Sequence, residues 1–181
     1  MMTENKTKTD SLVVWDPCVR FFHWALVTAF AVSQITAEWL DLVHEYSGYV
    51  IFGLIVSRLV WSLVGPKTAR FSRDWVNPIA IVQHLKELIT GRQSTQVGHN
   101  PAGGAMILVL LVSLMITAVS GYLGQTNWFW GSEWLEEIHE AFGEGLLILV
   151  GIHVAAVLIM SLLEKKNLIR AMLTGRFTSD S

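Results

Sequence analysis

Residues 134–163 decide the fold, and they read WLEEIHEAFGEGLLILVGIHVAAVLIMSLL. Residues 145–163 contain no Asp, Glu, Lys or Arg, and a helix of this length can cross the hydrocarbon core of a membrane. His139 and His153 lie fourteen residues apart in this stretch. With about 3.6 residues per turn, this spacing puts both imidazoles on nearly the same helix face, about 21 Å apart along the axis. Because an unpaired polar ring in lipid is costly, each imidazole needs a partner.

The whole chain has the composition of a small polytopic membrane protein. Of its 181 residues, 52% are hydrophobic, and the mean hydropathy of +0.45 is too high for a soluble domain of this size. Apolar runs predict transmembrane helices over about 18–38, 43–65, 101–124 and 135–164, with Asp16 as the N-cap of the first and Pro17 in its first turn. We therefore expect the lipid bilayer, and no nucleic acid, among its partners.

A different kind of helix is expected between the second and third spans. Asn77 and Pro78 mark its start and Gly91 its end, and its apolar residues share one face, which predicts an amphipathic surface helix over about 77–90. Residues 167–176 resemble it and predict a second. The predicted fold class is an all-α integral membrane protein, a four-helix transmembrane bundle with one or two cytoplasmic surface helices. It forms one domain over residues 15–176, after a mobile cytoplasmic N-terminus of residues 1–14.

The charges predict how the chain lies in the membrane. None of the thirteen Lys and Arg residues falls in the loops 38–45 or 125–140. The positive-inside rule therefore puts both termini and the 65–101 loop in the cytoplasm. The opposite end is acidic. Its acids are either ordinary solvated loop charges or a docking face for a cationic partner.

One motif occurs twice, at the outer start of the second and fourth spans. His44 and His139 both begin the pattern His-Glu-x-x-Gly, which ends at Gly48 and Gly143. A glycine four residues after a histidine lies on the same helix face, so it leaves room for a flat group beside the imidazole. When the second and fourth spans are aligned on this motif, Arg58 falls at the position of His153. The sequence offers no buried acid to pair with Arg58.

Depth in the membrane sorts four histidines into two pairs. His44 and His139 lie about 5 Å or less from the outer boundary, whereas His23 and His153 lie about 22–24 Å from it. Two imidazoles facing each other across a bundle suit the axial ligation of a haem. Cys18 is the only cysteine, so the chain has no Cys-x-x-Cys-His motif for covalent attachment of a haem. Hydrogen-bonded core histidines, or a histidine-based zinc or proton conductor, are the alternative readings.

Several motifs resemble those of the prokaryotic cytochrome b561 family, in the branch that includes the cytochrome b subunits of nickel-iron hydrogenases. They are RFFHW at 20–24, the stretch 44–61 ending in SRLVW, GHNPAGG at 98–104, and the helix of His139 and His153. The resemblance covers about residues 14–176. It implies four helices in a bacterial inner (cytoplasmic) membrane and two b-type haems, with His23, His44, His139 and His153 as ligands.

From the residues and this resemblance we expect transmembrane electron transfer between the quinone pool (ubiquinone or menaquinone) and a redox partner such as a c-type cytochrome, as in a respiratory chain. Arg58, and with it Arg20, is expected to pair with propionates of the inner haem. His99 is expected to bond a propionate or a quinone oxygen, or to cap its helix, and no catalytic residue is predicted. The alternative is a self-contained superoxide:quinone oxidoreductase, but outer loops without Lys or Arg are unsuited to attracting an anion.

Overall fold

The computed structural model describes residues 16–66, 69–89, 101–163 and 167–176, and most of these residues are helical. Four helices are long and apolar enough to cross a membrane: α1 (Pro17–Thr36), α2 (Asp41–Val64), α4 (Pro101–Gly124) and α5 (Glu133–Leu163). This confirms the predicted fold class. Each observed helix begins and ends within two residues of its expected bounds.

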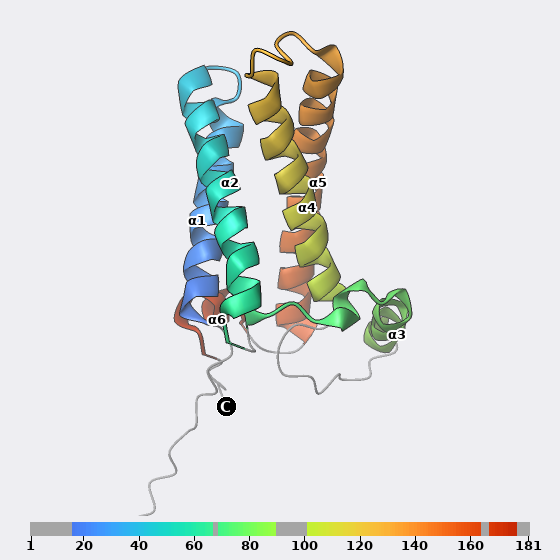
Figure 1. The fold of residues 1–181 in the computed structure, drawn as a ribbon. Coiled ribbons are helices and arrows are strands. Elements are labelled where there is room, and N and C mark those ends of the chain that lie inside the picture. Colours follow the sequence, from blue (N-terminus) through green and yellow to red (C-terminus); the bar gives the residue numbers. More distant parts are fainter. Residues whose placement is uncertain (1–15, 67–68, 90–100, 164–166, 177–181) are drawn as a thin grey trace, which may run out of the picture.

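The four long helices form two antiparallel hairpins (Figure 1). In one hairpin α1 packs against α2, in the other α4 packs against α5, and contacts between α2 and α4 join the two. Where they meet, buried aliphatic side chains form the core: Ala29, Ile51, Ile55, Leu111, Leu114 and Leu146. Many outward-facing apolar side chains are exposed, Leu162 at 79% for example. In a membrane these side chains contact lipid, so their exposure needs no protein partner.

The first span starts where the sequence predicts. The Asp16 carboxylate accepts hydrogen bonds from the backbone N–H groups of Cys18 and Val19, at 2.9 and 3.2 Å, and Pro17 is the first residue of α1. A side-chain acceptor at this position satisfies N–H groups that the helix itself leaves unpaired. The predicted N-cap is confirmed.

Two shorter helices lie at the same end of the bundle, one beside the start of α4 and the other beside the start of α1 (Figure 1). They are α3 (Pro78–Ile89) and α6 (Leu168–Thr174). α3 starts at Pro78 because the Asn77 side chain caps it, accepting from Ile79 N–H at 3.0 Å. Helices are therefore present at both predicted positions, and their place on the membrane surface stays a prediction.

A 3-10 turn, η2 (Arg73–Val76), connects α3 to the bundle. It brings Trp75, only 4% exposed, flat onto Gly104 of α4. A Cβ atom at Gly104 would lie 2.2 Å from Trp75 Cγ, so only glycine allows this approach. The second glycine of the Gly103-Gly104 pair thus has a packing role at the start of α4.

Candidate haem-binding sites

The structure brings His44 of α2 and His139 of α5 together near the α1–α2 and α4–α5 loops. We call this end of the bundle the outer end, and the half that lies nearer α6 the inner half. Their ring centroids are 5.9 Å apart and their planes are inclined at 83°. Metal–imidazole bonds are about 2 Å long, so two imidazoles on opposite sides of one metal have centroids about 6 Å apart. The observed separation fits two axial ligands of a single iron.

Hydrogen bonds hold both of these rings in the tautomer that a metal ligand needs. His44 Nδ1 lies 2.9 Å from the carbonyl oxygen of Ser33, and His139 Nδ1 lies 2.8 Å from that of Thr117. A carbonyl can only accept, so each Nδ1 carries the proton and donates it. The lone pair of each ring is then on Nε2, which is free to bind iron.

The outer pair is supported by residues that sequence reasoning missed. Gly121 of α4 lies against His139, and a Cβ atom there would be 2.8 Å from His139 Cε1. A signal for this contact was present in the sequence. Ser113, Thr117, Ser120 and Gly121 recur at helical spacing along a span that is otherwise almost wholly apolar. Such a stripe of small and polar residues indicates a close neighbour within the bundle.

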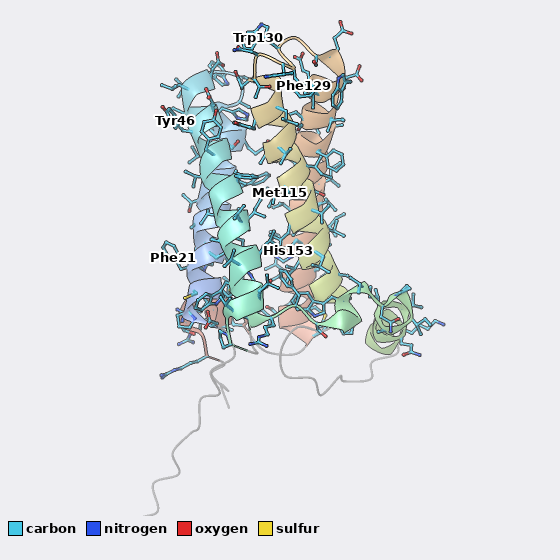
Figure 2. The ribbon with its side chains drawn as sticks, viewed as in Figure 1. Phe21, Tyr46, Met115, Phe129, Trp130 and His153 are labelled. Carbon is cyan, nitrogen blue, oxygen red and sulfur yellow. The ribbon has the colours of Figure 1, made fainter. Side chains whose placement is uncertain are left out.

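The other two histidines also lie near each other, in the inner half of the bundle. His23 of α1 and His153 of α5 are close enough to interact electrostatically. Figure 2 labels His153 in the half nearer α6. His23 Nδ1 is buried and, among the residues that the structure describes, has no hydrogen-bond partner. A buried nitrogen of this kind is normally satisfied, so it suits a group bound between α1 and α5.

Arg58 of α2 is a buried cation close to the inner pair's end of the bundle. Its side chain is 5% exposed, its guanidinium carbon lies 4.7 Å from the centre of the Phe71 ring, and its Nη1 has no partner within the described chain. One acid that the sequence did not suggest interacts with it. Asp16 interacts electrostatically with Arg58 and accepts a bond from Trp61 Nε1 at 3.2 Å. Because the Asp16 carboxylate also caps α1, it leaves Arg58 Nη1 available for another anion.

The remaining predicted site residues differ in their surroundings. At Gly48 and at Gly143 a Cβ atom would meet nothing within 4 Å, so there is open space beside both of these positions. Arg20 is already engaged, because its guanidinium donates to the carbonyls of Met172 and Leu173 at the end of α6. His99 lies outside the described residues.

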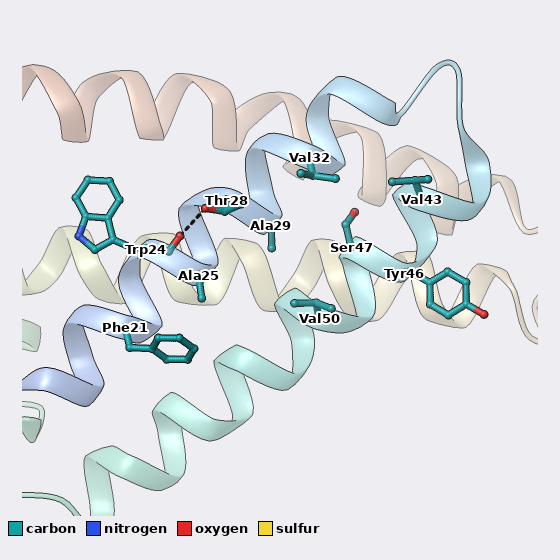
Figure 3. Close-up of a pocket in the computed structure, with 10 residues that line it drawn as sticks. All are labelled: Phe21, Trp24, Ala25, Thr28, Ala29, Val32, Val43, Tyr46, Ser47 and Val50. Carbon is teal, nitrogen blue, oxygen red and sulfur yellow. Dashed lines mark hydrogen bonds between the residues drawn. The ribbon is translucent and has the colours of Figure 1, made fainter. Parts of the chain in front are cut away.

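A groove between two of the long helices is separate from the histidines. It has a volume of about 590 Å³ and lies between α1 and α2, with Phe21 and Trp24 toward one end and Tyr46 toward the other (Figure 3). None of the four histidines lines it. Within the same described residues, no three His, Cys, Asp or Glu side chains gather closely enough to hold a bare metal ion. The paired imidazoles fit a planar haem between the two hairpins.

Comparison with known proteins identifies the family of the chain. The family described as prokaryotic cytochrome b561 matches residues 14–175, nearly the whole chain. The chain belongs to this family. It is thus a prokaryotic cytochrome b561-type protein with four helices that could span a membrane.

Two curated relatives of this cytochrome carry the description "Probable Ni/Fe-hydrogenase 1 B-type cytochrome subunit", one from Escherichia coli strain K12 and one from Escherichia coli O157:H7. Each is 21% identical over 145 residues, which cover 64% of this chain. The match spans 62% of the length of either relative. No solved structure matches the chain significantly.

Proposed function

We propose that this cytochrome carries electrons across the membrane through two haems b, between the quinone pool and a redox partner on the side opposite the chain termini. His44 and His139 would hold the outer haem, and His23 and His153 the inner one. The observation that carries the proposal is the outer pair, in which two imidazoles from different hairpins face each other at 5.9 Å with both Nδ1 atoms bonded to carbonyls.

The described residues supply binding and orientation, while a bound haem supplies a reversible one-electron couple. A haem held by two histidines would have no coordination site left for oxygen, which favours electron carriage. The Ser33 and Thr117 carbonyls orient the outer ligands. At the inner site, the unpaired Nη1 of Arg58 is suited to a propionate, because a charge-assisted bond there would satisfy a buried donor. The Arg20 guanidinium already bonds carbonyls of α6, so it gives no comparable support for a bond to a propionate.

The positions of the histidines along α5 suit transfer across the bilayer. His139 and His153 lie fourteen residues apart on one continuous helix, Glu133–Leu163, which separates them by about 21 Å along its axis. The hydrocarbon core is about 30 Å thick. Two haems at these depths would therefore shorten the distance over which each electron transfer across the insulating layer takes place.

The charge of the outer end favours a cationic partner such as a c-type cytochrome. Exposed carboxylates gather in and beside the two loops there: Glu38, Asp41, Glu133, Glu136, Glu137 and Glu140. Lys and Arg are absent from residues 38–45 and 125–140. Such a field attracts cations and repels anions. It therefore supports an acceptor or donor protein over superoxide, and the positive-inside rule supports cytoplasmic termini at the opposite end.

Reconstitution into liposomes tests the proposed route. We expect a short-chain quinol to reduce the bound haem and a cationic c-type cytochrome, added outside, to reoxidise it. The second step should slow as the salt concentration rises, because screening weakens the attraction between exposed charges. The double variant Glu136→Gln, Glu137→Gln should slow reoxidation by the c-type cytochrome and leave reduction by quinol unchanged.

Three outcomes would contradict the proposal or a part of it. Haem that quinol cannot reduce would exclude the quinone pool as donor. Rapid reduction of the haem by superoxide in quinone-free protein, close to the diffusion limit, would instead support a superoxide:quinone oxidoreductase. A rate of reoxidation that does not depend on salt would show that the acidic loops are not the docking face.

A further inference from the structure

A serine hydroxyl lies beside the Nδ1 atom of each outer histidine. Ser33 Oγ is 3.2 Å from His44 Nδ1, and Ser120 Oγ is 3.5 Å from His139 Nδ1. Both serines are buried, at 7% and 4% exposure. They come from equivalent places in the two hairpins, since α1 supplies one and α4 the other. Each ligand therefore has a carbonyl and a hydroxyl around the same nitrogen.

The hydroxyl of Ser120 competes for the carbonyl that orients His139. Ser120 Oγ donates to the carbonyl oxygen of Thr117 at 3.0 Å, and that oxygen also accepts the bond from His139 Nδ1 at 2.8 Å. Two donors that share one acceptor each form a weaker bond than either would alone. At 3.5 Å from Nδ1, Ser120 Oγ itself is at the limit of hydrogen bonding.

The hydroxyl of Ser33 has the opposite relation to its histidine. Many helical serines donate to the carbonyl three or four residues earlier, as Ser47 and Ser57 do here. Among the interactions that the structure describes, Ser33 Oγ makes no such bond and contacts only His44 Nδ1. Because His44 Nδ1 carries the proton, Ser33 Oγ accepts. His44 Nδ1–H therefore has two acceptors, the Ser33 hydroxyl and the Ser33 carbonyl. Little competes for this carbonyl, because Thr36 Oγ1 bonds Val32 O at 2.7 Å and lies 3.4 Å from Ser33 O.

We propose that Ser33 and Ser120 are positioning residues that tune the reduction potential of the outer haem in opposite directions. The proposal rests on the ligation proposed above. A stronger bond from Nδ1–H makes the imidazole a more basic ligand and so stabilises oxidised iron. Ser33 strengthens this bond at His44 and lowers the potential. Ser120 donates to the same Thr117 carbonyl as His139, so it weakens the bond from His139 Nδ1–H and raises the potential.

Redox titration of single variants of the full-length, haem-loaded chain tests the proposal. We expect Ser33→Ala to raise the midpoint potential of the outer haem and Ser120→Ala to lower it. Each change should alter the ratio of reduced to oxidised haem about threefold at a fixed potential, or ~30 mV for a one-electron couple. The inner haem provides an internal reference. Ser57→Ala is the matched control, because Ser57 is exposed on α2 and bonds only its own helix.

Two further readouts separate tuning from loss of structure. The electron paramagnetic resonance spectrum of the oxidised outer haem should shift in both alanine variants with the haem content unchanged. Ser33→Thr, which keeps the hydroxyl, should restore the wild-type potential. Shifts of both variants in the same direction, an equal shift of both haems, or unchanged outer potentials with both haems bound would overturn the proposal. A wild-type chain that bound no outer haem would overturn the proposed ligation as well.

Discussion

Replacing His153 by alanine is expected to remove the inner haem and leave the outer one bound. His153 is proposed to hold the inner haem with His23, with which it interacts electrostatically, so the loss of either would leave one ligand there. The outer pair has its own hydrogen bonds, from His44 to Ser33 and from His139 to Thr117, and none of them involves His153. The haem content per chain should fall from two to one.

The reciprocal variant His139→Ala provides the control for this experiment. It should remove the outer haem and keep the inner one, and the two variants should lose different steps of the redox titration. The haem that remains in each variant also reports that the protein has folded. Equal loss of both haems from His153→Ala, with both retained in His139→Ala, would contradict the pairing of the histidines.

A methyl group added at Gly121 is expected to disrupt the outer site almost as strongly as the loss of a ligand. The new Cβ atom would lie 2.8 Å from His139 Cε1 and 2.9 Å from its Nδ1, closer than side-chain carbons approach one another. The ring must move, and the 2.8 Å bond to the Thr117 carbonyl would break with it. Loss of such support lowers metal affinity about 10- to 100-fold. Gly121→Ala should therefore purify with the inner haem and little of the outer one.

Gly124→Ala is the matched variant on the same helix. A Cβ atom at Gly124 meets nothing within 4 Å, so this change should leave both haems bound. Haem content and the absorption spectrum of the reduced protein measure the difference between the two variants. Full occupancy of the outer site in Gly121→Ala would show that His139 is not held as the structure has it.

The fold could be predicted because each of its determinants is local in the sequence. Hydropathy marked the four spans, the Asp16-Pro17 pair marked the start of α1, and an amphipathic period marked α3. Depth alone grouped the histidines, since position along a membrane helix converts directly into distance from the boundary. The structure brings the rings of His44 and His139 together, and their role as haem ligands stays a prediction.

Contacts between helices account for what the sequence did not reveal. Gly121 matters only because His139 of the neighbouring helix lies against it. Arg58 appeared to lack an acid, yet the fold brings Asp16 near it from the start of α1. Arg20 was expected at a propionate, but α6 turns back to α1 after the last span and presents carbonyls that its guanidinium bonds. Such pairings depend on helix rotation and crossing, which hydropathy does not specify.

The haem content and spin state of the purified wild-type chain test the central claim most directly. Four histidines from three helices are proposed to ligate the iron atoms of two haems b. Pyridine extraction should therefore give two haems b per chain, and electron paramagnetic resonance of the oxidised protein should show only low-spin iron with two imidazole ligands. A single haem per chain, a colourless protein, or high-spin iron with an open position would contradict the account.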